Sequence, residues 1–207
     1  MTETLKVGRD IKKIVQRIAE LIRQGKVLVC PTDTVYGFIT DATNKGAVER
    51  LFKIKKRQKD KAFPIFVRDI ETAKKLAQVD ERTERFLKKV WPGKVTVILK
   101  LKGKSIKRKI YGVGKKTIGL RIPDYALIKL LLAKVNKPLT GTSANISGKP
   151  SSNKIREVIA QLRGQRILPD LILDAGNLKK AQPSTVIDLT KKKPKILRMG
   201  QRSPKLI

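Results

Sequence analysis

Short apolar strands and amphipathic helices alternate irregularly along this chain, and that alternation most constrains its fold. Ile11, Ile14 and Ile18 recur at helical spacing, which predicts a helix that Gly25 ends. Further helices are expected at residues 48–55, 71–79, 84–91, 125–136 and 155–162. Strands are expected at residues 27–30, 63–67, 95–101, 118–122, 138–142, 171–174, 184–189 and 195–198. This irregular order predicts an α/β (α+β) fold: a single domain over residues 1–207, with flanking helices on a twisted, mixed β-sheet.

The segments between these elements carry recognisable caps and one basic loop. Asn44 is a candidate cap for the second helix, and Ser152 for the helix that Gly164 ends. Residues 102–116 are rich in Gly and Lys, and we expect them to form a flexible loop. This loop is a candidate lid or RNA contact, although an ordinary surface loop has the same composition.

The apolar content fits a folded protein outside the membrane. Hydrophobic residues make up 40% of the chain, which is enough to bury a core. No apolar run approaches the roughly 18–20 residues that span a bilayer, and no signal peptide is recognisable at the start. Cys30 is the only cysteine, so an internal disulfide is excluded. We therefore expect a cytoplasmic protein with no membrane partner.

The charge balance is strongly basic. Lys and Arg total 49 against 17 Asp and Glu, which gives a formal net charge of +32. A field of that size attracts polyanions, including nucleic acids and nucleotides. The cations are spread along the chain, so a merely solvated surface remains an equal alternative. With 5 Phe, 3 Tyr and 1 Trp, a base-stacking platform is poorly supported.

The chain contains no histidine. Ser-His-Asp and Cys-His catalytic arrangements are therefore excluded, and no protein metal site is predicted. An enzyme of this composition would have to rely on Lys, Arg, hydroxyl groups and backbone amides.

Four polar clusters follow or open the predicted elements, at residues 31–37, 55–57, 141–151 and 183–188. Hydroxyl groups and free amides after buried strands often bind ligands, and adjacent Lys and Arg suit phosphate. The third cluster is not a Walker loop, because no Gly-Lys-Ser/Thr closes it. Taken singly, each cluster is a weak signal: a turn stiffened by Pro31 and Asp33 also explains the first, and a solvated Lys/Arg cluster also explains the second.

In order, the clusters read Pro-Thr-Asp-Thr-Val-Tyr-Gly, Lys-x-Arg, Ser-Ala-Asn-x-Ser-Gly and Pro-Ser-Thr-Val-Ile-Asp, followed by Ile-Leu-Arg-x-Gly. This ordered set resembles the YrdC-like threonylcarbamoyl-adenylate synthase family over about residues 11–202. Longer members carry an extra C-terminal domain, so the chain resembles the short, single-domain form.

The resemblance implies roles for particular residues. Lys55 and Arg57 would be catalytic and would hold the ATP phosphates. Thr34, Arg121 and Ser184 would bind L-threonine, with Arg121 pairing bidentately with its carboxylate. The rest of the ATP site would comprise Lys61, Thr117, Ser143, Asn145, Ser151 and Arg198.

The resemblance also implies the reaction and its partners. L-Threonine, bicarbonate and ATP, with Mg²⁺, would give threonylcarbamoyl-AMP and pyrophosphate for tRNA modification, reaching tRNA directly or through a partner transferase. A non-enzymatic protein that binds double-stranded RNA on the same fold is the main alternative. Carbamoyl-adenylate formation, as in hydrogenase-maturation proteins, is less favoured because the chain lacks their additional modules.

Overall fold

The computed structural model of the chain describes residues 2–8, 10–191 and 193–200. The helices are α1 (Ile11–Arg23), α2 (Lys45–Lys55), α3 (Ile70–Leu76), α4 (Glu81–Val90), α5 (Lys104–Lys109), α6 (Ala126–Val135) and α7 (Ile155–Leu162). The strands are β1 (Glu3–Lys6), β2 (Leu28–Cys30), β3 (Gly37–Ile39), β4 (Pro64–Phe66), β5 (Val95–Lys100), β6 (Thr117–Arg121), β7 (Leu139–Thr140), β8 (Thr142–Ser143), β9 (Leu171–Asp174), β10 (Thr185–Asp188) and β11 (Lys195–Arg198). Among the described residues, none of the helices combines the length and apolar character needed to cross a membrane.

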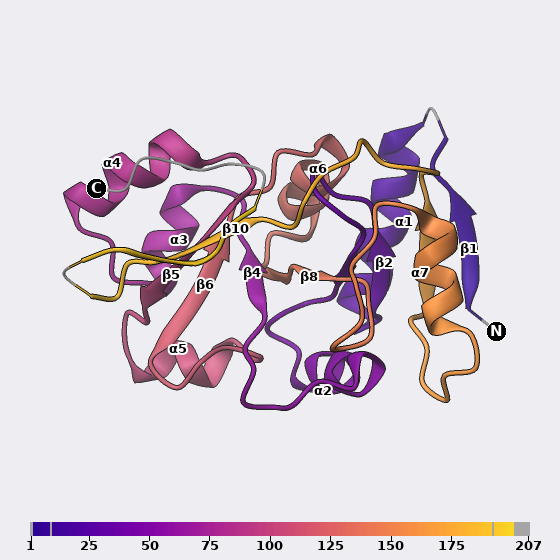
Figure 1. Ribbon diagram of the computed structural model, residues 1–207, viewed down its shortest axis with the longest axis horizontal. Helices are drawn as coiled ribbons and strands as arrows, with labels where there is room; N and C mark the ends of the chain where they lie inside the picture. The colour runs from indigo at the N-terminus through magenta and orange to yellow at the C-terminus, as the bar shows by residue number, and fades with distance from the viewer. Residues whose placement is uncertain (1, 9, 192, 201–207) are drawn as a thin grey trace.

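The strands form two mixed sheets that lie side by side (Figure 1). The five-stranded sheet has the order β1-β9-β2-β3-β8, and the six-stranded sheet has the order β11-β10-β5-β6-β4-β7. In the first, β2 runs parallel to β9 and antiparallel to β3. In the second, β5 runs parallel to β10 and antiparallel to β6. The predicted α/β class with mixed strands and flanking helices is confirmed, although the strands divide between two sheets.

The chain passes from the six-stranded to the five-stranded sheet at Gly141, within the single strand expected at residues 138–142. β7 ends just before Gly141 and pairs with β4 of the six-stranded sheet. β8 begins just after it and pairs with β3 of the other sheet. The chain therefore crosses from one sheet to the other within one residue, which period-two patterning alone does not reveal.

Three further expectations were wrong in detail. Strands β1 and β3 were not predicted. Such short strands gain their stability from pairing with other strands, which local sequence patterns do not reveal. α5 occupies part of the expected loop; none of its residues is buried, so it leaves no apolar period in the sequence. Ser152 does not cap α7, whose N-cap position is Lys154. By contrast, Asn44 caps α2 as expected, with its side chain accepting from the Ala47 amide at 3.0 Å.

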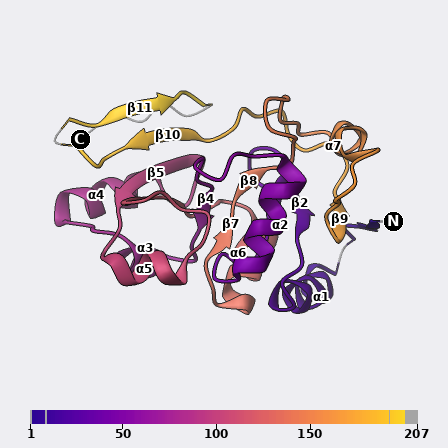
Figure 2. The ribbon, with the colours of Figure 1, turned by 90° about the horizontal axis from the view of Figure 1, so that it is seen from below.

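The five-stranded sheet packs against helices on both of its faces, whereas the six-stranded sheet packs against α3 and α4 on one face. On β2, Leu28 and Cys30 pack with α1 and α6, while Val29 packs with α2 and α7 on the opposite face. On β5, Val95, Val97 and Leu99 belong to the cluster that contains α3 and α4. Figure 2 shows α3 and α4 lying on one side of β5. Because side chains alternate along a strand, the intervening residues of the six-stranded sheet face the other way.

We predict that Gly141→Ala destabilises the protein by about 1–3 kcal/mol, the usual cost of overpacking. A Cβ atom at Gly141 would overlap the ring of Phe66, which is 2% exposed and cannot move into solvent. Urea denaturation would measure the loss. Gly8→Ala is the matched control, because a Cβ atom there meets nothing within 4 Å. Equal unfolding free energies for the two variants would contradict the close packing.

Candidate active site between the two sheets

A cavity of about 290 Å³ opens on the face of the six-stranded sheet that points away from α3 and α4. β5 contributes Thr96 and Ile98 to its lining, and β6 contributes Thr117, Gly119 and Arg121. These are the alternate residues whose neighbours on the same strands enter the core. The loop after β2 and strand β8 close the cavity from the five-stranded sheet, so the site lies where the two sheets meet.

Most of the expected site residues come together in this cavity. Those that line it are Thr34, Arg57, Thr117, Arg121, Ser143, Ser184 and Arg198. The expected contacts Lys55, Lys61, Asn145 and Ser151 are not among the described residues that line it. Residues of all four polar clusters of the sequence thus converge on this one cavity.

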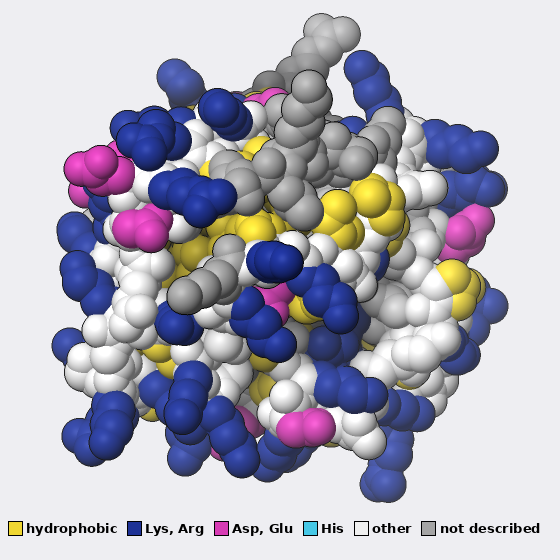
Figure 3. Space-filling view, turned by 60° about the vertical axis from the view of Figure 1, so that its left-hand side comes forward, with side chains coloured by type: hydrophobic (Ala, Val, Ile, Leu, Met, Phe, Trp, Pro, Cys, Tyr) yellow, Lys and Arg dark blue, Asp and Glu magenta, His cyan; other side chains and the backbone are white. Residues whose placement is uncertain are grey.

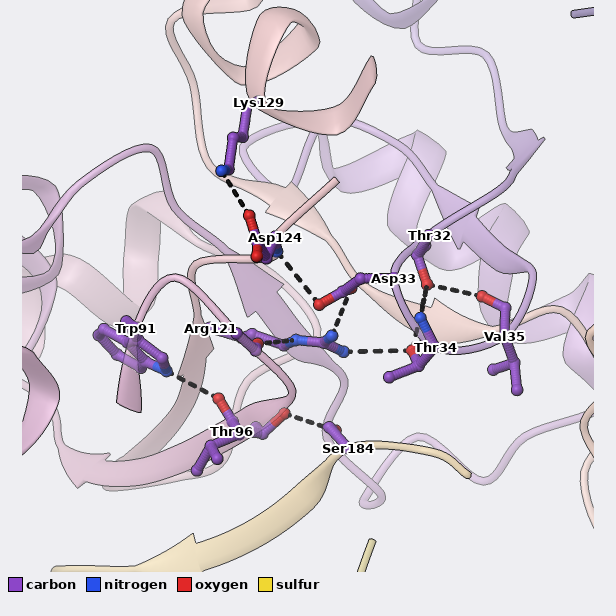
Figure 4. Close-up of polar contacts among 12 residues, drawn as sticks. Thr32, Asp33, Thr34, Val35, Trp91, Thr96, Arg121, Asp124, Lys129 and Ser184 are labelled. Carbon is purple, nitrogen blue, oxygen red and sulfur yellow. Dashed lines mark hydrogen bonds and ion pairs between the residues drawn. The ribbon is translucent and has the colours of Figure 1, made fainter. Parts of the chain in front are cut away.

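Arg121 is the most strongly held side chain of the site (Figure 4). Its Nη2 atom lies 2.5 Å from Asp33 Oδ1, and its Nε atom donates to the Gly93 carbonyl at 2.9 Å. Its Nη1 atom lies 3.4 Å from Thr34 Oγ1. The Arg121 and Asp33 side chains are 4% and 6% exposed. Arg121 is the last residue of β6 and Asp33 follows β2, so this buried ion pair links the two sheets at the cavity.

Asp33 is fixed from its other side as well. Its Oδ2 atom accepts the backbone amide of Asp124 at 3.1 Å (Figure 4). Burial lowers the pKa of Arg121, and the charge of Asp33 opposes that shift. Sequence reasoning treated Asp33 as a residue that stiffens a turn and missed its pairing, because Arg121 is 88 residues away along the chain.

The loop after β2 is stabilised by its own hydroxyl groups. Thr32 Oγ1 donates to the Val35 carbonyl at 2.7 Å and accepts from the Thr34 amide at 3.1 Å. Thr32 and Thr34 are each 4% exposed. The turn places the Thr34 hydroxyl at the cavity beside Arg121, where it can bind a polar ligand.

A second hydroxyl cluster lies across the cavity, where β10 begins. Ser184 Oγ lies 2.9 Å from Thr96 Oγ1. Arg198 Nη2 donates to the Ser184 carbonyl at 2.9 Å and to its Oγ atom at 3.2 Å. Burial, together with the positive charge of Arg121, lowers the pKa of Arg198. Thr96 was not expected in the site, although it lies on the non-core side of the clearest predicted strand.

Arg57 follows α2 and lies over the Phe63 ring, 5.3 Å from its centroid. Its Nε atom donates to the Lys61 carbonyl at 2.8 Å, and its Nη2 atom donates to the Ala62 carbonyl at 3.0 Å. Lys61 therefore contributes its backbone to the site by holding Arg57 in place. Burial lowers the pKa of Arg57.

The described residues that line the cavity include Arg57, Arg121 and Arg198, and none of them carries a carboxylate. A guanidinium group presents a planar fork of donors that matches phosphate and carboxylate oxygens. Six hydroxyl side chains (those of Thr34, Thr96, Thr117, Thr142, Ser143 and Ser184) add neutral donors. The cavity is therefore suited to a ligand that carries several anionic oxygens.

Lys55 lies behind the cavity wall and is 1% exposed. Its Nζ atom donates to the Ser143 carbonyl at 2.5 Å and to the Asn145 carbonyl and Oδ1 atoms at 2.9 and 3.0 Å. Ser143 Oγ also donates to Asn145 Oδ1 at 2.6 Å. The lysine thus ties α2 to the loop after β8, and Ser143 is the member of this network that lines the cavity.

We predict that Lys55→Met destabilises the protein by at least about 2 kcal/mol, because it leaves buried acceptors without a donor. Burial, and secondarily the charge of Arg57, lowers the pKa of Lys55 to about 7. Between pH 7 and 9 the unfolded chain then binds more protons at Lys55 than the folded chain. The stability advantage of the wild type over Lys55→Met should therefore grow with pH, by up to about 1.4 kcal/mol per unit.

Denaturation at pH 7, 8 and 9 measures this difference. Lys53→Met is the control, since Lys53 is an exposed residue of the same helix. A stability difference between wild type and Lys55→Met that stays constant over this range would contradict the shifted pKa.

Comparisons of the sequence with family models and with known proteins identify relatives of this chain. The family model described as Telomere recombination, for Sua5, YciO and YrdC proteins, matches residues 20–200. A putative threonylcarbamoyl-AMP synthase of Methanocaldococcus jannaschii is 36% identical over 91% of this chain and 86% of the relative. The threonylcarbamoyl-AMP synthase of Pyrococcus abyssi is 36% identical over 97% of this chain and 58% of the relative.

The fold agrees with these sequence matches. The crystal structure of P. abyssi Sua5 complexed with L-threonine is similar, with a TM-score of 0.83 and 33% identity. The match covers 97% of this chain and 57% of that one. The chain thus spans less than two thirds of the Pyrococcus proteins but most of the Methanocaldococcus one. From the family match over residues 20–200 and these relatives, the chain belongs to the Sua5/YciO/YrdC family.

Proposed function

We propose that the chain is an L-threonylcarbamoyladenylate synthase, a nucleotidyltransferase that joins L-threonine, bicarbonate and ATP. One observation carries this proposal: the cavity between the sheets gathers Arg57, Arg121 and Arg198 with hydroxyl groups. Relatives named threonylcarbamoyl-AMP synthase support it. ATP and bicarbonate are cytoplasmic metabolites, and a cytoplasmic location is part of the proposal.

In this proposal Arg121, Thr34 and Ser184 hold L-threonine. Arg121 Nε and Nη2 are engaged by the Gly93 carbonyl and Asp33, and Nη1 lies toward Thr34. The substrate carboxylate would take the cavity side of the guanidinium, while Asp33 keeps that group in position. A relative whose structure contains L-threonine supports an amino acid as the ligand.

The ATP phosphates would lie toward Arg57 and Arg198, with the hydroxyl groups of Thr117 and Ser143 beside them. Lys55 and Asn145 would act by shaping the loop that carries Ser143, and Lys61 by holding Arg57. Ser151 remains a predicted ATP contact. Two observations support these roles: the four polar clusters meet at one cavity, and guanidinium groups bind phosphate oxygens well.

The reaction needs no protein nucleophile. The threonine amine takes up bicarbonate with loss of water, and the resulting carbamate oxygen attacks the α-phosphorus of ATP. The bond to the β-phosphate oxygen breaks, and pyrophosphate leaves. Catalysis would come from alignment of the substrates and from guanidinium charge at the phosphate oxygens. The product would then serve tRNA modification, directly or through a partner transferase.

Mg²⁺ is part of the proposal as a companion of ATP. No group of three or more His, Cys, Asp or Glu side chains that could hold a metal occurs in the described part of the chain. The side-chain oxygens among the described residues that line the cavity are hydroxyl groups, so in this proposal the cation would be held chiefly by the phosphate oxygens of ATP. When bound, Mg²⁺ would neutralise phosphate charge.

A non-enzymatic RNA-binding protein is a weaker candidate. The charge of +32 favours it. A polyanion-binding surface does not, however, require a buried, hydrogen-bonded arginine at the junction of two sheets. The enzyme proposal gives Arg121 and its partner Asp33 a role that the alternative leaves unexplained.

Pyrophosphate release from ATP and bicarbonate in the presence of Mg²⁺ tests the proposal. We predict release that depends on L-threonine and is not supported by serine or glycine at matched concentration. Arg57→Ala should slow release on the order of 10²–10³-fold, the usual loss for one positioned donor.

Arg156→Ala is the matched control, because Arg156 is exposed on α7 and lies outside the cavity lining. It should leave the rate unchanged. The proposal fails if the folded wild type releases no pyrophosphate under any of these conditions, or if release proceeds equally without an amino acid.

A further inference from the structure

Positive charge alone cannot orient a ligand in the cavity between the two sheets. Lys and Arg total 49 against 17 Asp and Glu, and their side chains far outnumber acidic ones on the face shown in Figure 3. Such a field attracts any anion, whatever its shape. The orientation of a bound ligand therefore depends on directional donors and acceptors inside the cavity, among them one pair of hydroxyl groups.

This pair consists of Thr96 on β5 and Ser184, the residue before β10 (Figure 4). Their Oγ atoms are 2.9 Å apart, and both residues line the cavity although they are only 2% and 5% exposed. β5 and β10 run parallel, and the Lys94 carbonyl accepts the Thr185 amide at 3.0 Å where they begin. The pairing of the two strands therefore sets the distance between the two hydroxyl groups.

The Thr96 side chain places its methyl group toward β6 and its hydroxyl group toward β10. Its methyl carbon lies 3.6 Å from the position that a Cβ atom would take on Gly119 of β6. Its Oγ1 atom has Ser184 Oγ as its hydrogen-bond partner among the described residues. Threonine carries two heavy atoms on Cβ and is stiff about χ1. The Thr96 hydroxyl group is therefore held toward Ser184.

Ser184 Oγ has a second partner, because Arg198 Nη2 donates to it at 3.2 Å. A hydroxyl group donates one hydrogen bond and accepts two. If Thr96 donates, its buried proton is satisfied and both lone pairs of Ser184 are engaged. The reverse direction would leave the Thr96 proton without an acceptor among the described residues, and an unpaired buried donor is costly. The favoured arrangement leaves the Ser184 proton available to a ligand.

A hydroxyl group whose lone pairs are both engaged can donate to a ligand oxygen but cannot accept from an ammonium group. Ser143, across the cavity, is arranged differently, because its Oγ atom donates to Asn145 Oδ1 at 2.6 Å. We propose that Thr96 is a positioning residue that holds Ser184 as a donor to an oxygen atom of the amino-acid substrate. Thr96 thereby determines which end of the amino acid faces Ser184, a role that rests on the proposed synthase function.

A double-mutant cycle tests whether Thr96 acts through Ser184. The variants are Thr96→Val, which keeps the shape but removes the hydroxyl group, Ser184→Ala, and the two combined. Thr96→Ser, which keeps the hydroxyl group, is the rescue variant. Isothermal titration calorimetry measures the Kd of each for L-threonine, and urea denaturation measures stability. Thr72→Val is the matched control, because it removes a hydroxyl group that donates to Asp69 Oδ1 at 2.6 Å outside the cavity lining.

We expect Thr96→Val to weaken L-threonine binding about three- to tenfold, the contribution of one neutral hydrogen bond, and Thr96→Ser to bind within about twofold of the wild type. In the Ser184→Ala background, Thr96→Val should change the affinity by less than about twofold, because the donor that it positions is already absent. The KM for ATP should not change in Thr96→Val, since Arg198 keeps its hydrogen bonds to the Ser184 carbonyl. Thr72→Val should lower stability without changing the affinity.

An equal loss of affinity from Thr96→Val with and without Ser184 would show that Thr96 acts through packing, and would overturn the proposal. Unchanged binding by Thr96→Val, or no rescue by Thr96→Ser, would also overturn it. If the wild type still releases pyrophosphate in a threonine-dependent manner, these outcomes leave the synthase proposal intact. A folded wild type that neither binds L-threonine nor releases pyrophosphate defeats the synthase proposal, and the role of Thr96 with it.

Discussion

The buried ion pair between Arg121 and Asp33 is the interaction on which the rest of the site depends. Arg121 ends a strand of one sheet, and Asp33 follows a strand of the other. A buried ion pair seldom adds much stability, because removing both charges from water costs about as much as their attraction returns. Here the ion pair fixes the orientation of the Arg121 guanidinium, which is held by Asp33 and by the Gly93 carbonyl, with Thr34 beside it. The two sheets are thereby fixed at the distance that leaves a cavity between them.

The cavity itself follows from the way strands alternate. Core residues of β5 and β6 pack on α3 and α4, so Thr96, Thr117 and Arg121 face the other way. The five-stranded sheet is covered on both faces and contributes loops to the site. Lys55 reinforces one of these loops from behind, with three acceptors around its amino group. Rigid elements thus hold the polar groups that would align two substrates.

Much of the fold could be predicted from local patterns, and the site only from their combination. The α/β class, the alternation on β5 and the Asn44 cap of α2 are all carried by neighbouring residues. The separation into two sheets was not predictable in this way, because it depends on long-range pairing at Gly141. Resemblance to a family identified seven residues that line the cavity. It could not show that Lys55 points into the wall, nor that Asp33 pairs with Arg121, since both depend on contacts about 90 residues apart along the chain.

In the proposed function, Arg121, held by Asp33, receives the carboxylate of an amino-acid substrate in the cavity. Isothermal titration calorimetry with L-threonine and with L-threoninamide, which lacks the carboxylate, tests this most directly. We predict that L-threonine binds and that L-threoninamide binds at least about tenfold more weakly. Arg121→Lys should remove most of this preference, because Lys lacks the planar fork. Equal affinity of the wild type for the two ligands would contradict the proposed role of Arg121.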